Sequence, residues 1–333
     1  MSITGPLADS LGRVHTDLRI SVTDRCNVRC FYCMPAEGVE FRRHEEILSY
    51  EEIERFARVA ARLGIRKLRL TGGEPLVRKG VVRLVEMLAA VPGIDDLAMT
   101  TNGMFLDRYA EALKAAGLHR LNVSLDTLDP AKFRRISGSD ELSRVLEGIA
   151  AAQRAGFERI KLNAVAIRGW TDDEIVPLAR FAREHGLELR FIEFMPIDGD
   201  GRWHSEQVFP GEKIHEILSR EIGPLDRVVS DGPRAPATVY RYADGGGRVG
   251  LIHSVSEPFC EHCNRLRLTA DGKVRNCLFS SSQWDAGALL RSGGTDEQLA
   301  ELIRAAVNQK KKAHGTDDGQ FAPSDRPMHQ IGG

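Results

Sequence analysis

The chain has 333 residues and a mass of 36.9 kDa, and 42% of its residues are hydrophobic, so it is long enough for two domains and apolar enough to bury a core. Its 46 Lys and Arg residues nearly balance 47 Asp and Glu residues. A net charge of −1 argues against a general binder of nucleic acid or of acidic lipid. No apolar run reaches the ~18 residues of a membrane helix, and the first 15 residues lack the apolar core of a signal peptide. We therefore expect a cytoplasmic protein with no nucleic-acid or membrane partner.

A repeated pattern runs through the first two thirds of the chain. Helical stretches end at a glycine and are followed by a run of alternating apolar residues, at Gly64, Gly93, Gly117, Gly156 and Gly186. Glycine suits these joints because it adopts the left-handed conformation that ends a helix without steric cost.

Two of these helices also carry a signal for their first turn. Ser49 with Glu52 and Thr171 with Glu174 both fit the capping box. Pro177 weakens the second assignment because it lies inside the helix that Thr171 would start.

The strands that follow the helices predict an α/β fold built from parallel units with right-handed crossovers. Six strands are expected, near residues 18–24, 67–72, 96–102, 119–126, 158–166 and 188–196. Eight would close a standard barrel, so six indicate a partial (β/α)6 TIM-like barrel or an open sheet.

Polar and apolar residues alternate along these strands, whereas strands buried on both faces read as continuous apolar runs. The apolar set should face the helices, which leaves the polar set facing a wet interior. This arrangement would direct five side chains into one cavity: Arg19, Arg69, Thr100, Lys161 and, with weaker support, Arg190. So many cations predict a polyanionic ligand, each charge-assisted hydrogen bond contributing roughly 1.5–3 kcal/mol. The alternative is an antiparallel sheet with one solvated face.

The pattern changes after Pro196. Residues 198–212 read as a loop, residues 230–250 are rich in Gly and Pro, and only the stretches near 212–220 and 295–312 look helical. We expect two domains, a partial barrel over residues 1–196 and a smaller cluster-binding and substrate-binding region over residues 197–333.

Six cysteines in a chain of this kind argue against a disulfide framework and leave metal binding, redox chemistry or burial. Cys26, Cys30 and Cys33 form a CxxxCxxC motif directly after the first strand, in a loop where barrel enzymes keep their chemistry. Three such thiolates can hold three irons of a four-iron cluster and leave the fourth iron open. Zinc completed by His15 or His44, or simple burial, are the alternatives.

These residues resemble those of the radical S-adenosylmethionine (SAM) superfamily, whose CxxxCxxC motif has an aromatic residue, here Tyr32, before its last cysteine. The segment Thr71-Gly-Gly-Glu-Pro75 is similar to the stretch by which that superfamily receives the amino group of SAM, with Glu74 placed to meet an ammonium. The resemblance implies a partial six-unit barrel with a wet interior.

A second group of cysteines, Cys260, Cys263 and Cys277, lies near the end of the chain. Asp271-Gly272 is a strong two-residue hairpin signal, which would pair Leu266 with Cys277 and bring Cys277 back to the CxxC loop. Arg265 and Arg267 would then project together beside the cysteines. The alternative is a zinc site completed by His262 or His253.

This second group resembles the auxiliary cluster of the GTP 3′,8-cyclase family, and the ending Gln330-Ile331-Gly332-Gly333 is similar to the Gly-Gly tail of that family. The resemblance implies two [4Fe-4S] clusters, one on each group of cysteines. It implies SAM contacts from Tyr32, Gly73, Ser124 and Met195. It implies GTP contacts from Arg19, Arg69, Thr100, Lys161, Arg190, Arg265, Leu266 and Arg267. It implies catalytic roles for Arg265, Arg267, Gly332 and Gly333.

The implied activity is that of a lyase in molybdenum cofactor biosynthesis. One electron cleaves SAM, the resulting radical takes hydrogen from the ribose 3′ carbon, and the sugar radical attacks carbon 8 of guanine. The implied partners are GTP, an electron donor and a downstream cyclic pyranopterin monophosphate synthase, and a homodimer is a further expectation. Two alternatives stay open: a radical SAM enzyme that modifies a peptide, and a zinc-stabilised interaction module without catalysis.

Overall fold

The computed structural model describes residues 6–35, 37–197, 201–228, 235–313, 324 and 326–332. Its strands are β1 (Asp17–Ser21), β2 (Lys67–Thr71), β3 (Asp96–Thr101), β4 (Arg120–Ser124), β5 (Ile160–Ala166), β6 (Glu188–Glu193), β7 (Leu225–Val228), β8 (Thr238–Tyr242), β9 (Arg248–Ile252), β10 (Arg265–Leu268), β11 (Lys273–Arg275) and β12 (Trp284–Asp285). Its α-helices are α1 (Tyr50–Arg62), α2 (Val81–Ala89), α3 (Leu106–Ala115), α4 (Pro130–Ser137), α5 (Leu142–Arg154), α6 (Ile175–Glu184), α7 (Gly211–Glu221), α8 (Ala286–Arg291), α9 (Asp296–Asn308) and α10 (Met328–Ile331). Short 3₁₀ helices lie at His44–Glu46, Pro75–Val77, Asp172–Glu174, Ser205–Gln207 and Phe259–His262.

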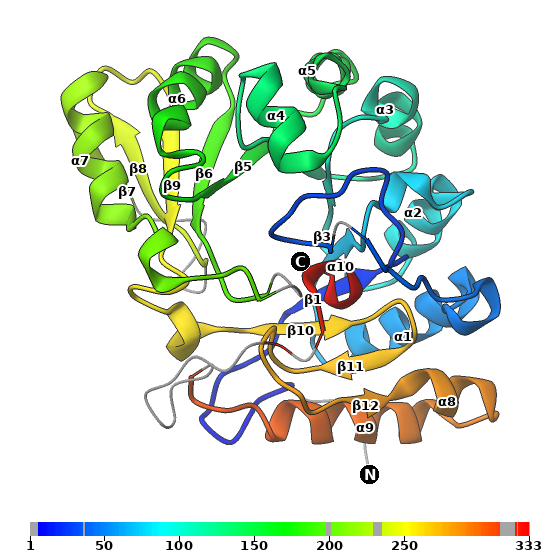
Figure 1. Cartoon of the computed structure of the whole chain (residues 1–333). Coiled ribbons are helices and arrows are strands. Elements are labelled where there is room, and N and C mark those ends of the chain that lie inside the picture. Colours follow the sequence, from blue (N-terminus) through cyan, green and yellow to red (C-terminus); the bar gives the residue numbers. More distant parts are fainter. Residues whose placement is uncertain are drawn as a thin grey trace.

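The strands of the described residues form one sheet in the order β12-β11-β10-β1-β2-β3-β4-β5-β6-β9-β8-β7. Strands β1 to β6 are parallel neighbours in chain order, which confirms the six predicted strands and excludes the antiparallel alternative. Helices α1 to α6 lie outside this curved sheet (Figure 1). The result is the predicted partial barrel.

Local sequence explains how the βα units begin and end. At the start of α1 the Ser49 hydroxyl accepts from the Glu52 amide at 3.1 Å, and the Glu52 carboxylate accepts from the Ser49 amide at 2.7 Å, so this capping box is confirmed. The five predicted joint glycines all have positive φ, from +65° at Gly186 to +109° at Gly64. A residue with a Cβ would be strained at each of them.

The second predicted capping box is wrong. The Thr171 hydroxyl donates to the Val165 carbonyl at 2.7 Å and accepts from the Ile167 amide at 2.9 Å, and it makes no capping bond. The α-helix begins only at Ile175, so Pro177 falls in the first turn, where its missing N–H has no helical partner to lose.

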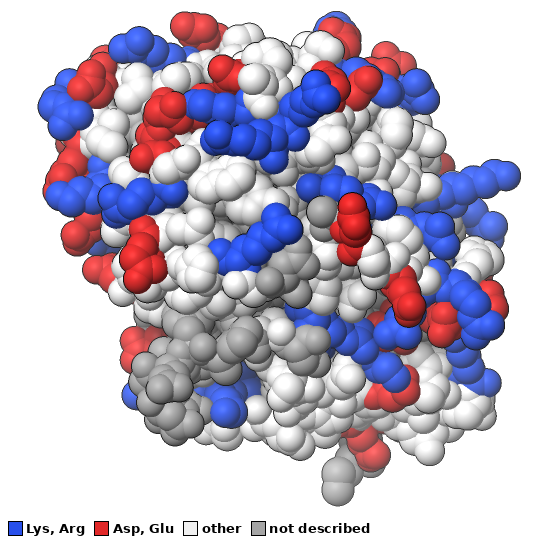
Figure 2. Space-filling model, viewed as in Figure 1, with Lys and Arg blue, Asp and Glu red and all other residues white. Residues whose placement is uncertain are grey.

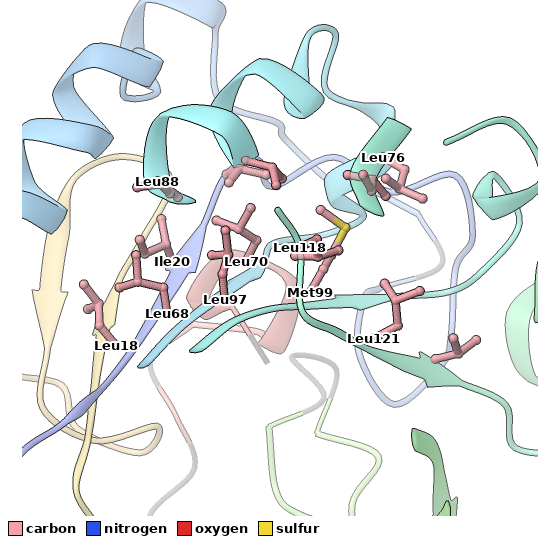
Figure 3. Packing of buried hydrophobic residues seen from close by; sticks show 14 of the residues in the cluster. Leu18, Ile20, Leu68, Leu70, Leu76, Leu88, Leu97, Met99, Leu118 and Leu121 are labelled. Carbon is pink, nitrogen blue, oxygen red and sulfur yellow. The ribbon is translucent and has the colours of Figure 1, made fainter. Parts of the chain in front are cut away.

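The core lies between the sheet and the helices. Leu18, Ile20, Leu68 and Leu70 are at most 1% exposed and project from β1 and β2 toward the helical layer, as Figure 3 shows. Each such side chain contributes roughly 1.5–3 kcal/mol on burial. The predicted apolar face is confirmed, and the polar residues of the same strands are left facing the barrel interior.

The second part of the chain extends both edges of this sheet. Strand β10 pairs in parallel with β1, and β9 pairs in parallel with β6. The predicted helices near 212–220 and 295–312 correspond to α7 and α9, whereas the Gly- and Pro-rich stretch 230–250 contains β8 and the start of β9, which were not predicted. The division at residue 196 stays a prediction, and the sheet crosses it.

The hairpin between β10 and β11 differs from its prediction by one residue. Arg267 pairs with Arg275 and Leu268 with Val274, so Leu266 does not pair with Cys277. The Thr269 amide donates to the Lys273 carbonyl at 2.9 Å, which leaves three residues in the loop between them. The Thr269 hydroxyl accepts from the Lys273 amide at 2.9 Å, and Gly272 at φ +78° closes the turn. A side chain that bonds across the loop thus stabilises the longer turn.

Acidic and basic side chains are interspersed over the face of the molecule drawn in Figure 2, as the balanced composition suggests. None of the helices in the described part of the chain is long and apolar enough to cross a membrane.

Candidate active site

A cavity of about 500 Å³ fills the barrel interior. It reaches the amino ends of the parallel strands at Asp17, Lys67 and Arg120 and their carboxyl ends at Asp126 and Met195. The predicted GTP-binding residues Arg19, Arg69, Thr100, Lys161, Arg190, Arg265 and Arg267 line it, together with the predicted SAM-binding residues Tyr32, Ser124 and Met195. The strand alternation therefore brings these side chains together.

Three of the arginines form a row. Arg267 on β10, Arg19 on β1 and Arg69 on β2 occupy the same register on neighbouring strands. Burial and the nearby charges of Arg267, Arg265 and Arg69 hold the pKa of Arg19 well below its usual range. Burial also lowers the pKa of Arg69 and of Arg267 to about 10. Like charges opposite one another destabilise a sheet, so this row favours an anionic ligand.

Two donors of this row have no partner within the described residues: the Nε atoms of Arg19 and Arg69 are buried without a hydrogen bond. Arg69 also reaches toward the Thr100 hydroxyl, with its Nη1 at 3.4 Å. A buried donor left unsatisfied costs about 1–3 kcal/mol. A ligand rich in acceptor oxygens would remove that cost.

Lys161 and Arg190 differ from the other cations because both contact the carboxylate of Glu188, at 3.1 Å and 2.7 Å. Their charges are therefore partly compensated within the protein. Within the described residues, Arg19, Arg69 and Arg267 form no such ion pair, although Asp17 lies near Arg19 and Arg69.

The loop with Cys26, Cys30 and Cys33 follows β1 and is held in a defined shape. The amides of Cys33 and Met34 both donate to the Cys30 carbonyl, at 2.9 Å and 3.0 Å. The amides of Arg29 and Phe31 donate to the carbonyls of Ser137 and Ile136, at 2.7 Å and 3.1 Å. Of this loop, Tyr32 lines the cavity.

The Gly-Gly-Glu segment is bonded directly to this loop's beginning. The Gly73 amide donates to the Thr23 carbonyl at 2.7 Å, and the Glu74 amide donates to the Arg25 carbonyl at 2.8 Å. A Cβ on Gly73 would lie 2.2 Å from the Arg25 carbonyl oxygen, so only glycine fits. Gly73 does not itself line the cavity.

Glu74 is held by hydrogen bonds within the protein, and its expected contact with an ammonium stays a prediction. It is 1% exposed, and its carboxylate accepts from the Leu76 amide at 3.0 Å, the Thr101 hydroxyl at 2.8 Å and the Asn102 amide at 2.7 Å. Burial raises the pKa of Glu74 to about 7. This carboxylate caps the helix at Pro75–Val77 and ties it to the end of β3.

Tyr32 is fixed by a partner that the sequence analysis did not identify. Its hydroxyl donates to the Asp126 carboxylate at 2.5 Å, and the other Asp126 oxygen accepts from the Val165 amide at 2.8 Å. Burial raises the pKa of Asp126 to about 6. The period of two along β4 places Asp126 on the same face as Ser124, and that signal could have found it.

The second group of cysteines lines the cavity with all three members. The Cys263 amide donates to the Cys260 carbonyl at 3.1 Å, and Cys277 follows β11 at the end that lies beside Cys263. Although burial alone would raise the pKa of the Cys263 thiol, Arg265 and Lys310 lower it to about 6. The hairpin therefore brings the three cysteines together even though its register differs from the prediction.

The two groups of cysteines lie at opposite ends of the barrel. Cys26 follows the carboxyl end of β1, whereas Cys263 precedes the amino end of β10, and β1 and β10 run parallel. The cavity that reaches both strand ends therefore lies between them.

Both groups fit an iron–sulfur cluster in the chemistry of their donors. Burial raises the pKa of Cys33 to about 12, with a contribution from Cys26, and burial together with Cys33 raises the pKa of Cys30, so these thiols lie close enough to interact. Within the described residues, no group of three or more His, Cys, Asp or Glu side chains is arranged to hold a metal ion. A four-iron cluster has a different requirement, because each of its thiolates binds a separate iron.

The end of the chain enters the same region. The Arg267 guanidinium donates to the Gly332 carbonyl, and the ring of His329 lies 3.3 Å from the Cys33 carbonyl oxygen. Figure 1 shows α10 in the middle of the molecule, near β1 and β10. A Cβ on Gly332 would lie 3.0 Å from Thr71 and 3.1 Å from Ser21. Gly333 lies outside the described residues.

Leu266 is the one predicted GTP contact whose side chain the structure places away from the cavity. It is fully buried in the core between sheet and helices, because it alternates with Arg265 and Arg267 along β10.

Comparisons with known proteins agree with this geometry. Residues 20–182 match the family model of the radical SAM superfamily, and residues 187–316 match that of Molybdenum Cofactor Synthesis C. A protein of Rhodopirellula baltica named GTP 3′,8-cyclase is 50% identical over 100% of this chain and 94% of its own length. Proteins of the same name from Moorella thermoacetica and Streptomyces coelicolor are 47% and 46% identical over 98% of this chain, and over 100% and 96% of their own lengths.

Among solved structures, Streptococcus suis SuiB bound to S-adenosylmethionine has a TM-score of 0.60 at 16% identity, covering 88% of this chain and 69% of SuiB. This likeness shows the fold alone, and it agrees with the partial barrel.

Proposed function

This chain belongs to the GTP 3′,8-cyclase family of the radical SAM superfamily, and on that premise we propose how its residues carry out the family's reaction. The protein is a lyase that converts GTP to (8S)-3′,8-cyclo-7,8-dihydroguanosine 5′-triphosphate, the first step of molybdenum cofactor biosynthesis. The observation that carries the assignment of the substrate is the arginine row, Arg267, Arg19 and Arg69, side by side in a cavity.

The two ends of the cavity have separate tasks in this proposal. Cys26, Cys30 and Cys33 hold one [4Fe-4S] cluster, and Cys260, Cys263 and Cys277 hold the second. When bound, the first cluster and SAM supply the one-electron and radical chemistry. Tyr32, Ser124 and Met195 contact SAM through the cavity wall, and Gly73 does so through its backbone.

The middle of the cavity binds the nucleotide. The arginine row and Thr100 hold the triphosphate, with Lys161 and Arg190 contributing less because Glu188 already pairs with both. Arg265 and the backbone of Leu266 lie toward the second cluster and contact the nucleotide there. These residues fix the ribose and the base relative to each other, which converts a search in solution into a reaction within one bound molecule.

The tail closes the site in this proposal. The contact between Arg267 and Gly332 brings Gly332 to the arginine row, where the tail excludes water from the reacting atoms. The catalytic roles of Arg265, Arg267, Gly332 and Gly333 are thus ones of positioning and of solvent exclusion.

Anaerobic reconstitution followed by turnover with GTP and SAM tests the function. We expect about eight irons per chain and a cyclised GTP product identified by mass spectrometry. A matched reaction with ATP in place of GTP should give no cyclised product. A reconstituted chain that cleaves SAM but leaves GTP unchanged would contradict the proposal, and modification of a peptide in its place would support the alternative of a peptide-modifying enzyme.

The remaining partners follow from the same chemistry. The reaction needs an electron donor, and its product needs a downstream cyclic pyranopterin monophosphate synthase. We also propose a cytoplasmic location, because six cysteines that bind iron must stay reduced. A homodimer is proposed as well, to be tested by sedimentation of the holoprotein.

A further inference from the structure

Lys310 is a buried lysine that follows α9 and lies beside the second group of cysteines. It is 5% exposed. Its Nζ donates to the Cys263 sulfur at 3.3 Å and to the Arg265 carbonyl at 2.7 Å. Lysine is almost never buried to this degree unless it is paired. Among the described residues no carboxylate lies against Lys310, and its polar contacts are the Cys263 sulfur and the Arg265 carbonyl.

The segment that carries Lys310 is held rigidly against the cysteines. The Arg13 guanidinium donates to the carbonyls of Cys260 and Lys311, both at 2.8 Å, and to that of Lys310 at 3.3 Å. The side-chain amide of Asn276, the residue before Cys277, donates to the Ala306 carbonyl of α9 at 2.8 Å. The ammonium of Lys310 therefore keeps a fixed position relative to the sulfurs.

The charge of Lys310 does not serve the substrate. Arg265 and Lys310 both act on Cys263, but Arg265 lines the cavity and Lys310 does not. Two cations thus approach one sulfur, and of the two only Arg265 lines the cavity. Lys310 is therefore expected to act on the cluster.

We propose that Lys310 is a positioning residue of the second cluster, whose charge next to the Cys263 sulfur makes that cluster easier to reduce. The physical reason is that reduction adds one negative charge, and a fixed positive charge in a poorly solvated place stabilises it. Hydrogen bonds to cluster sulfurs shift reduction potentials in the same way. The inference rests on the proposed function, because it requires a cluster on Cys260, Cys263 and Cys277.

The test compares Lys310→Gln, Lys310→Arg and Lys312→Met in the full chain. Cys26→Ser, Cys30→Ser and Cys33→Ser are present in every protein, so that the second cluster alone gives the signal. Gln keeps an N–H donor without the charge, Arg keeps the charge, and Lys312 is an exposed lysine of the same segment. Iron per chain is measured after anaerobic reconstitution, and the midpoint potential is measured by electron paramagnetic resonance during titration with dithionite.

We expect Lys310→Gln to retain its iron and to reduce with an equilibrium constant roughly tenfold lower, a shift of about 59 mV to more negative potential for one electron. The equilibrium constant for reduction of Lys310→Arg should stay within threefold of that of the parent protein, and that of Lys312→Met should equal it. An unchanged midpoint potential in Lys310→Gln overturns the inference. A fall of the midpoint potential in Lys310→Arg equal to that in Lys310→Gln overturns it as well.

If Lys310→Gln holds no cluster, the result for Lys310→Arg decides whether the inference stands. A Lys310→Arg protein with an intact cluster at the parent's potential supports the role of the charge. Loss of the cluster in Lys310→Arg as well overturns the inference. A parent protein that binds no iron on the second group of cysteines contradicts the proposed function itself, so the two failures are distinguishable.

Discussion

At the scale of single residues, burial and partners decide which charged side chains are available to a ligand. Lys161 and Arg190 share Glu188, whereas Arg19, Arg69 and Arg267 stand in one register across three strands. The carboxylate of Glu74, which a motif would assign to ligand binding, accepts three hydrogen bonds within the protein. The arginine row is therefore the part of the cavity whose removal should weaken the substrate most.

Arg267→Ala should raise the KM for GTP by roughly 10- to 150-fold, because a charge-assisted hydrogen bond to phosphate contributes roughly 1.5–3 kcal/mol. Arg265 also hydrogen-bonds to the Cys263 sulfur, whereas Arg267 also donates to the Gly332 carbonyl, so Arg267→Ala removes the tail contact together with the phosphate contact. Steady-state kinetics of the reconstituted enzyme measures the change, and iron per chain should stay at its wild-type level. Arg227→Ala, at an exposed position on β7, is the matched control. GTP kinetics equal to wild type in Arg267→Ala would refute the assignment.

At the scale of elements, Glu193 at the end of β6 joins three segments. Its carboxylate accepts from the Gly211 amide of α7 at 3.1 Å and from the Val255 and Ser256 amides after β9, at 2.9 Å and 2.8 Å. His253 lies 3.6 Å from it. Although burial would raise its pKa, His253, the Ser256 hydroxyl and the Ser256 and Val255 amides lower the pKa of Glu193 to about 2.

Glu193→Gln should cost about 2 kcal/mol in the free energy of unfolding at pH 5.5, because an amide cannot accept as many hydrogen bonds as a carboxylate. A depressed pKa gives stability that is present above the unfolded value near 4.5 and is lost as pH falls toward 2. The difference in the free energy of unfolding between wild type and Glu193→Gln should therefore become smaller between pH 4.5 and pH 3. His253 stays protonated in this range because Glu193 raises its pKa.

Urea unfolding of the cluster-free chain, followed by circular dichroism at pH 5.5, 4.5 and 3, measures this difference. Glu216→Gln removes an exposed ion pair with Lys213 and serves as control, since such a pair contributes about 0–1 kcal/mol. A difference that keeps its size down to pH 3 would show that the charge of Glu193 is not what stabilises the junction.

The hairpin of β10 and β11 shows that a turn signal predicts where the chain reverses but not the register of the two strands. Asp271-Gly272 correctly indicates a reversal of the chain, but the Thr269 hydroxyl bonds to the Lys273 amide and lengthens the loop by one residue. The function of the hairpin survives because Cys277 still returns to the end where Cys260 and Cys263 lie.

At the scale of the whole molecule, the sheet does not end where the sequence pattern changes. Strand β1 takes β10 as its neighbour and β6 takes β9, so both edges of the six-stranded barrel are covered by the second part of the chain. Uncovered edges of this length invite association with other chains. The partial barrel is therefore complete only in the full molecule.

A fragment of residues 1–196 should be unable to form a stable monomer, since it exposes both edge strands and the apolar surface beneath α9. Size-exclusion chromatography and limited proteolysis should show aggregation or rapid cleavage. A fragment of residues 1–313 retains every strand in the sheet order and should be as free of aggregation as the full chain, although it lacks the tail that closes the site. A monomeric, protease-resistant 1–196 fragment would instead establish an independent first domain.

The sequence by itself determined the helix and strand order of the barrel, its polar interior and both cysteine groups, because periodicity, joint glycines and close spacing are local properties. Only the tertiary structure decided that Glu188 compensates two of the cations, that Glu74 is internal, that Asp126 fixes Tyr32 and that Lys310 lies on the Cys263 sulfur. These contacts join segments that are distant along the chain, or depend on which hydrogen bonds burial leaves to be satisfied. No local pattern records such choices, because they are made by packing between elements.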